Sequence, residues 1–400
     1  MPDIEKRIAA LDPDRLRLLE KRVRERNLRS SVPGPPETTA LLGPEAARGY
    51  LPRASVFLFS GDEDATPTAR YDLILAIARM ADERGFSAVW TPERHYDRFG
   101  GLYPSPAVLG AAIAAVTRHI GVRAGSVVLP LHSPMCVAEE WSVVDNLSNG
   151  RVGLSLAPGF HPQDFAGRPE VFRDRRELLA RGLRELQNIW EGAAVPLHLP
   201  DGAPTAIRLH PRPIQKKLPL WLTAAGSELT FVQAGQWGLN ILTAMMGQNL
   251  EQLTAKITKY RQARATAGLQ PEGGTVTVML HTYVGESEDE LRRVAHPALK
   301  RYLETHTEFA ALKLSQEEKG YLTMLSEADR QAVLDRAVAR YRRHRSLVGT
   351  PDYCRNMLRA LAVAGVDEVA CLVDFGVEPH AVMSSLHRLV DLMAPLPATC

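Results

Sequence analysis

The strongest constraint on the fold is a regular alternation, beginning after Pro52, between short apolar runs and longer segments with helical periodicity. The short runs are rich in β-branched residues, as strands are. The segments between them repeat apolar residues every three to four positions, as amphipathic helices do. The eight predicted strands span residues 55–60, 88–92, 121–130, 152–157, 220–225, 239–244, 275–284 and 368–375. Eight strand–helix units predict an α/β fold, a closed (β/α)8 TIM barrel.

The helices between these strands carry recognisable boundary residues. Thr66-Pro67 precedes a helix that Gly85 ends, and Thr350-Pro351 precedes the last helix, which Gly365 ends. Ser or Thr before a helix, Pro in its first turn and Gly after its last turn are typical of helix ends. An open doubly wound sheet is the competing architecture, but the GxGxxG motif that usually follows its first strand is missing here.

The chain divides into residues 1–50 and residues 51–400. Apolar residues recur at helical spacing between Ile4 and Val23, and the first 30 residues hold nine Lys or Arg against six Asp or Glu. A Pro- and Gly-rich segment, residues 30–36, follows as a linker. We therefore predict a basic helical extension at 1–50, ahead of a barrel at 51–400.

Two insertions are predicted within the barrel. Residues 194–213 are expected to form a short hairpin with Asp201-Gly202 at its turn, and residues 296–346 a polar helical insertion. Either of them could cover the mouth of the barrel.

Composition excludes several functional classes. The 48 Lys and Arg nearly balance the 46 Asp and Glu, so neither a nucleic-acid partner nor a membrane surface is expected. No apolar run approaches the roughly 18–20 residues that cross a bilayer, and the first ten residues are charged rather than secretory. No CxxC pair occurs among the widely spaced cysteines, which predicts a reducing, cytoplasmic compartment; they are Cys136, Cys354, Cys371 and Cys400.

Polar residues gather just after the predicted strands, where a barrel of this type carries its chemistry. Four histidines lie there: His95, His132, His161 and His281. Gly226-Ser227 precedes a predicted helix, whose free amides and dipole favour a phosphate, and the hydroxyls of Ser227 and Thr230 can add donors. Ser227 acting only as a helix cap is the alternative.

The four histidines are also compatible with a metal-dependent barrel hydrolase. However, no HxH or HExxH occurs, and the nearby carboxylates Glu93, Asp97 and Asp164 form no recognisable ligand set. We therefore expect no metal.

The strand-end segments resemble the bacterial luciferase-like flavin-dependent monooxygenases, and more closely those of natural-product (nonribosomal peptide and polyketide) biosynthesis. The likeness covers about residues 56–375. It is most specific at residues 92–96 (PERHY), 100–104 (GGLYP), 123–132 (RAGSVVLPLH), 138–141 (AEEW), 146–151 (NLSNGR), 220–226 (LWLTAAG) and 279–282 (MLHT).

The resemblance implies an enzyme that binds reduced, dissociable FMN and reacts it with O2 to a C4a-peroxide. One oxygen atom then passes to a secondary-metabolite intermediate, free or bound to a carrier protein. Because the chain has no nicotinamide-binding fingerprint, a separate flavin reductase is expected as a partner. The residues implied for cofactor binding are Gly125 and Ser126 at a non-proline cis peptide under the flavin ring, Ala157 and Gly159 beside it, and Ala225, Gly226, Ser227 and Thr230 at the phosphate.

Three residues are candidates for catalysis. The family carries a pair of histidines where this chain has Arg94-His95. His95 could transfer a proton, Arg94 could stabilise a developing anion, and His281 is a further candidate. Which of Arg94 and His95 acts is left open, as is whether carbon or nitrogen is oxygenated.

Other interpretations of the same barrel also stay open: hydride transfer with coenzyme F420, or a non-catalytic flavin-binding protein. A homodimer is expected through residues 105–118 and 134–148, where Val137, Trp141 and Val144 follow helical spacing. That stripe could equally face the barrel.

Overall fold

The computed structural model describes residues 51–59, 67–311 and 327–393. The predicted helical extension at 1–50 lies outside the described residues, as do residues 312–326 of the predicted insertion.

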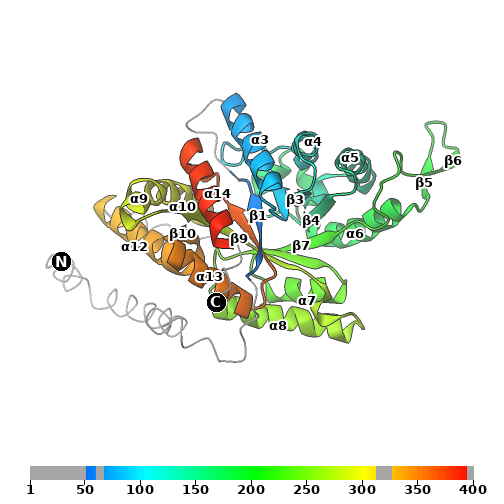
Figure 1. Cartoon of the computed structure of the whole chain (residues 1–400). Coiled ribbons are helices and arrows are strands. Elements are labelled where there is room, and N and C mark those ends of the chain that lie inside the picture. The colour runs from blue at the N-terminus through cyan, green and yellow to red at the C-terminus, as the bar shows by residue number, and fades with distance from the viewer. Residues whose placement is uncertain (1–50, 60–66, 312–326, 394–400) are drawn as a thin grey trace, which may run out of the picture. The chain divides into compact units, whose positions relative to one another are not determined.

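Eight parallel strands form a closed barrel, which confirms the predicted fold (Figure 1). In chain order they are β1 (Arg53–Phe57), β2 (Ala88–Thr91), β3 (Gly121–Val128), β4 (Val152–Ala157), β7 (Leu220–Ala224), β8 (Asn240–Ala244), β9 (Val276–Val284) and β11 (Glu368–Leu372). Each of these eight strands pairs with the next one in this order, and β11 pairs with β1 to close the barrel. A short additional strand, β10 (Leu347–Gly349), was not predicted and pairs with β9.

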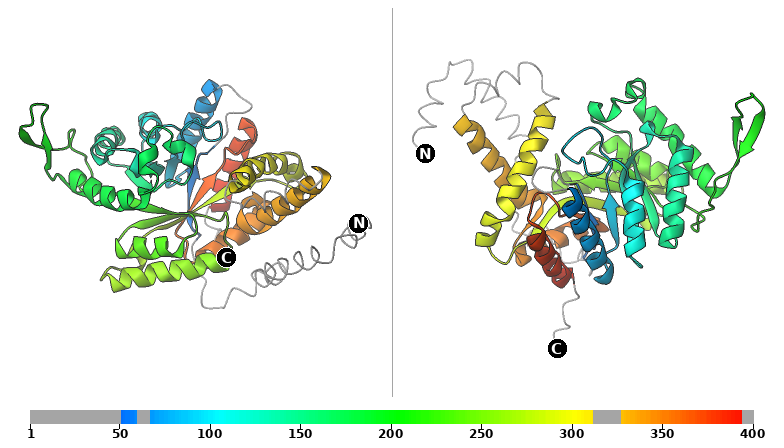
Figure 2. Two further views of the ribbon diagram at one scale, coloured as in Figure 1. Left: turned by 180° about the vertical axis from the view of Figure 1, so that it is seen from behind. Right: turned by 90° about the horizontal axis from the view of Figure 1, so that it is seen from above.

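Helices surround the barrel, as the 3.6-residue periodicity predicts (Figure 2). They are α3 (Pro67–Glu83), α4 (Pro106–Val116), α5 (Pro134–Ser148), α6 (Arg175–Glu191), α7 (Glu228–Gln236), α8 (Leu250–Thr266), α9 (Glu288–Arg293), α10 (Ala295–Ala311), α12 (Glu327–Arg345), α13 (Pro351–Val363) and α14 (Pro379–Met393). Among the described residues, no helix combines the length and the apolarity that a bilayer crossing requires.

A charged group fills the amino-terminal end of the barrel. The Arg123 guanidinium lies 5.0 Å from the ring centroid of Trp90 and 4.6 Å from that of Trp221, and it donates to the buried Glu368 carboxylate at 2.8 Å. Ser55 also donates to Glu368. Because this charge is paired and stacked where the strands begin, the opposite, carboxyl end of the barrel remains for a ligand.

The predicted hairpin forms, and the described parts of the predicted helical insertion are helices α10 and α12; of the two insertions as described, only the helical one follows the carboxyl end of a strand. The first is an antiparallel hairpin of β5 (Val195–His198) and β6 (Pro204–Ile207). It extends away from the barrel, on the side opposite α10 and α12 (Figures 1 and 2). The idea that it covers the mouth is wrong, because it joins the end of α6 to the start of β7. The helical insertion, by contrast, follows the carboxyl end of β9.

The apolar stripe considered for a dimer faces inward. Val137, Trp141 and Val144 are buried in the core between α5 and the barrel. The open alternative, that this stripe packs on the barrel, is therefore the correct one.

Candidate active site at the barrel mouth

Four neighbouring strands bring the candidate residues to one end of the barrel. The strands β2, β3, β4 and β7 pair in this order, and all run in the same direction. The loops that follow them therefore meet at one edge. His95 follows β2, His132 follows β3, Ala157 ends β4 and Gly226 follows β7.

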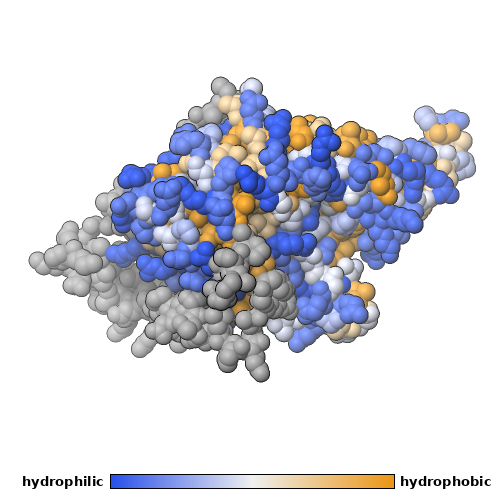
Figure 3. All heavy atoms as spheres, viewed as in Figure 1, coloured by the Kyte–Doolittle hydropathy of each residue, from blue (hydrophilic) through white to orange (hydrophobic). Residues whose placement is uncertain are grey.

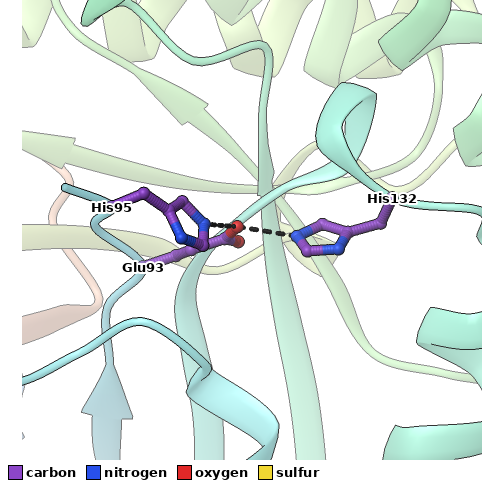
Figure 4. A group of neighbouring side chains, drawn as sticks. All are labelled: Glu93, His95 and His132. Carbon is purple, nitrogen blue, oxygen red and sulfur yellow. Dashed lines mark hydrogen bonds and ion pairs between the residues drawn. The ribbon is translucent and has the colours of Figure 1, made fainter. Parts of the chain in front are cut away.

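The centre of this region is the carboxylate of Glu93, which is fully buried and lies between two histidines (Figure 4). Its Oε1 is 2.8 Å from His95 Nε2 and 2.6 Å from His132 Nε2. Its Oε2 accepts a hydrogen bond of 2.7 Å from the backbone amide of Val128. The three side chains come from two loops and share one charged group.

The geometry fixes the charge of this cluster. Burial favours the neutral form of Glu93, but the hydrogen bonds from His132 and His95 outweigh it and lower the pKa of the carboxyl. Burial also opposes a charge on His132. The hydrogen bond and the negative charge of Glu93, aided by Glu140, nevertheless raise the pKa of His132 against the repulsion of Arg168. The cluster therefore holds an ionised carboxylate beside a histidine that favours its cationic form.

Arg94 is buried and already has anionic partners. Its guanidinium donates to Asp164 and Asp97, at 3.1 Å in each case. Asp164 also accepts a hydrogen bond of 3.0 Å from the backbone amide of His95. Because two carboxylates compensate its charge, Arg94 connects the loop after β2 with the loop after β4. The role considered for Arg94, stabilising a developing anion as a fixed cation, stays a prediction, and these two carboxylates are the partners with which that anion would compete.

His281 lies in a different environment from His95. It is fully buried, and its Nδ1 is 2.7 Å from the Tyr341 hydroxyl. The rings of Tyr302 and Phe375 pack against it edge to face, with centroids 4.4 and 5.5 Å away. The structure therefore places His281 in an aromatic cluster that attaches α10 and α12 to the barrel, apart from the histidines at the ends of β2 and β3.

The Gly125–Ser126 peptide bond is cis, as the resemblance implied. The Ser126 hydroxyl lies 2.5 Å from that of Thr223, which lies 2.6 Å from that of Ser155. A Cβ at Gly125 would come within 2.8 Å of the Phe57 ring and 3.1 Å of Trp90. Core packing alone therefore requires glycine at position 125. In the sequence analysis, this glycine was explained by the close approach of a flavin ring.

Gly159 has a similar explanation. Its φ is +73°, and a Cβ would meet Phe165 at 2.7 Å and Val128 at 2.8 Å. Backbone conformation and packing thus already require glycine here. Ala157 is partly exposed at the end of β4.

The loop after β7 has the donors of an anion site. Gly226 has a φ of +108°, and a Cβ there would lie 3.7 Å from Lys256 Nζ. Ser227 is the N-cap residue of α7, but its side chain makes no capping hydrogen bond. Its hydroxyl, the first-turn amides and Thr230 in that turn are donors suited to phosphate. This region therefore fits the phosphate of a flavin nucleotide, with Ala225 exposed beside it.

Sequence reasoning named His132 and Glu93 near the strand ends but assigned neither of them a role in catalysis or cofactor binding, and it did not name Lys256. Lys256 lies in α8, where its Nζ donates to Gln248 at 2.9 Å, and nothing in its local pattern indicates that it approaches Gly226. Glu93, by contrast, stands next to the candidate Arg94-His95 pair, and that position is a signal which could have identified it.

The cluster of Glu93, His95 and His132 is also the group of described residues that could bind a metal ion. Ligand atoms of Glu93, His95 and His132 lie within 4.8 Å of one another, a spacing that could hold a metal ion. The sequence shows no recognisable ligand set among these histidines and carboxylates, because spacing along the chain does not reveal that the loops after β2 and β3 meet. In this structure the three side chains contact one another through Glu93 Oε1, which lies within hydrogen-bond distance of Nε2 of both histidines.

Comparisons with known proteins agree with this architecture. Residues 53–368 match the family model of the luciferase-like monooxygenases. The oxygenase component of flavin-dependent trigonelline monooxygenase from Acinetobacter baylyi is 24% identical over 345 residues, which are 83% of this chain and 91% of that protein.

Two solved structures share the fold. The oxygenating constituent of 3,6-diketocamphane monooxygenase from Pseudomonas putida, in complex with FMN, has a TM-score of 0.67 at 18% identity and covers 86% of this chain and 98% of its own. An F420-dependent secondary alcohol dehydrogenase has a TM-score of 0.64 at 14% identity, over 86% of this chain and all of its own. Because the family model spans most of the sequence, this chain belongs to the luciferase-like monooxygenases and is an enzyme, a flavin-dependent monooxygenase.

Proposed function

We propose that this enzyme is the oxygenase component of a two-component system that uses reduced FMN and O2 to oxygenate a secondary-metabolite intermediate. The observation that carries the proposal is the anion site of Gly226, Ser227 and Thr230, which lies at the same end of the barrel as the Glu93–His95–His132 cluster. The relative from Acinetobacter baylyi, named as an oxygenase component, supports a separate reductase as partner.

Bound reduced FMN would supply the electrons that activate O2. The chain would hold the phosphate through the amides at the start of α7, the hydroxyls of Ser227 and Thr230, and the nearby Lys256 ammonium. The cis segment Gly125–Ser126 and the partly exposed Ala157 belong to the adjacent strand ends β3 and β4, where the ring would lie.

His95 is the residue we assign to proton transfer. It is partly exposed at the mouth, with 20% of its side chain accessible, and its orientation is held by Glu93. An imidazole can donate and accept protons near neutral pH, as the protonation of a departing oxygen requires.

Coenzyme F420 is the second candidate, because an F420-dependent enzyme shares this fold. It would transfer hydride instead of activating O2. The test is to mix the enzyme anaerobically with reduced FMN or with reduced F420, and then to add labelled dioxygen and candidate substrates. We expect only reduced FMN to bind tightly, and one labelled oxygen atom to enter the product. Binding of reduced F420 alone, with hydride transfer, would overturn the FMN proposal.

The substrate is proposed to be a natural-product intermediate, free or attached to a carrier protein. The resemblance to assembly-line oxygenases supports this class. Turnover of a carrier-bound thioester, compared with a free thioester mimic, distinguishes the two forms of delivery.

We also propose a homodimer, now through the outer face of α4 and α5. Val108 is 72% exposed, Val143 45% and Leu147 54%, and Ala112 and Ala115 are exposed on the same helix as Val108. Figure 3 shows apolar surface over these two helices. Burial of such a surface against a second copy would remove it from water.

A further inference from the structure

The Glu93 carboxylate is unusual in having no exposed surface and two imidazoles on one oxygen. Taking a carboxylate out of water costs several kcal/mol unless donors and positive charge compensate it. Here the Val128 amide binds Oε2, while His95 Nε2 and His132 Nε2 both contact Oε1. Buried carboxylates with this many partners are held rigidly, so the partners are held as well.

The ionised state of Glu93 determines which nitrogen of each imidazole carries a proton. A carboxylate can only accept hydrogen bonds. Both Nε2 atoms must therefore carry a proton and donate it to Oε1. In His95 this leaves Nδ1 as the ring atom that can gain or lose a proton while the contact to Glu93 stays intact.

His132 supplies the compensating charge. Its side chain is 33% exposed, whereas that of Glu93 has no exposed surface. The charged groups that face His132 are Glu93 from the loop after β2, Glu140 from α5, and Arg168 from the segment after β4. The two carboxylates favour the cationic imidazole and the guanidinium opposes it. His95, in turn, meets Glu93 through its ring and Asp164 through its backbone amide.

We propose that Glu93 is a positioning residue for the oxygenation reaction, which fixes His95 with its proton on Nε2 so that proton transfer takes place at Nδ1, while His132 balances the carboxylate charge. The inference rests on the proposed role of His95 as a proton donor. In the donating step, cationic His95 would give the proton on Nδ1 to the departing oxygen and become the neutral imidazole that still donates from Nε2 to Glu93. Solvent then restores the proton on Nδ1.

The test uses the full chain and begins without cofactor. Nitrogen NMR of the histidine rings in the wild-type protein should show His95 protonated on Nε2, and a His132 titration midpoint above that of an ordinary histidine. The variant Glu93→Gln keeps the size of the side chain but removes its charge. In this variant the midpoint of His132 should fall, and His95 should lose its single tautomer.

The kinetic arm follows the coupling of reduced-FMN oxidation to product formation. In Glu93→Gln we expect coupling to fall on the order of 10²-fold, as for loss of a positioned acid, while affinity for reduced FMN is unchanged. The pH profile of coupling should also change, which a purely structural loss would not cause. His119→Gln is the matched control, because this exposed histidine precedes β3 at the opposite end of the barrel.

Two results would overturn the inference: a wild-type His95 protonated on Nδ1 alone, or a folded Glu93→Gln protein with wild-type coupling and pH profile. The first needs no variant, so it holds even if Glu93→Gln fails to fold. If the NMR result is as expected but reduced FMN gives no oxygenation, then the proposed function fails and the assignment of the tautomer stands.

Discussion

Arg94 Nη1 lies 3.1 Å from Asp164 Oδ2, and this buried ion pair joins the loop after β2 to the loop after β4. Since Asp164 also accepts from the His95 amide, the pair sets the backbone position of the proposed proton donor. The relative positions of these two loops at the barrel mouth therefore depend on this charge pair.

Replacing Asp164 with Asn should destabilise the fold by about 3 kcal/mol, because it leaves a buried guanidinium with Asp97 as its remaining carboxylate. Urea unfolding followed by circular dichroism measures the change. Asp289→Asn is the control, since its ion pair with Arg292 is exposed and should contribute less than about 1 kcal/mol. Equal losses in the two variants would contradict the structural role assigned to Asp164.

The stabilising effect of His132 should depend on pH. Its pKa is raised above the ordinary value of 6.5 in the folded protein, so the proton is bound more tightly in the folded state than in the unfolded state. That stabilisation is fully present below 6.5 and is lost as the pH rises through the raised folded value. The difference in unfolding free energy between wild type and His132→Gln should therefore be larger at about pH 6 than at about pH 9. A difference that grows with pH would contradict the ion pair with Glu93.

His95→Gln should uncouple oxygen activation from substrate oxygenation. The loss of a positioned proton donor costs about 10²- to 10⁴-fold in product formation, and hydrogen peroxide should appear instead. Binding of reduced FMN should persist. Product and peroxide are measured in the same reaction. Wild-type coupling in this variant would transfer the role to another group, with Arg94 and His281 as the remaining candidates.

Lys256→Met should weaken binding of reduced FMN by about tenfold or more, because a charge-assisted contact to phosphate contributes roughly 1.5–3 kcal/mol. Affinity for reduced riboflavin, which has no phosphate, should not change. Lys259→Met is the control, since Lys259 lies on the same helix but pairs with Glu228 at 2.6 Å. An equal loss for the two ligands would remove Lys256 from the phosphate site.

Leu147→Glu should convert the proposed dimer into a monomer, because it introduces a charge into the apolar face of α4 and α5. Light scattering at micromolar concentration reports the mass, with 44.1 kDa expected for the single chain. Leu197→Glu on the hairpin is the control and should leave the mass unchanged. A wild-type protein that is already monomeric would reject the dimer.

The sequence by itself determined the order and nature of the barrel units. Strand and helix periodicity are local properties, so runs such as 121–130 and 152–157 identified β3 and β4 without knowledge of their neighbours. The Gly226-Ser227 step before α7 was also recognisable locally, because helix boundaries depend on a few adjacent residues.

Only the tertiary structure decided which groups meet. Glu93 binds His132, 39 positions away, and Gly226 lies near Lys256 because α7, which follows Gly226, packs against α8. The sequence also could not determine which face of α5 packs on the barrel. Val144 is buried against the barrel, whereas its neighbour Val143 is exposed, and helical periodicity alone does not tell the two faces apart. Contacts between distant residues depend on strand pairing and packing, which no local pattern encodes.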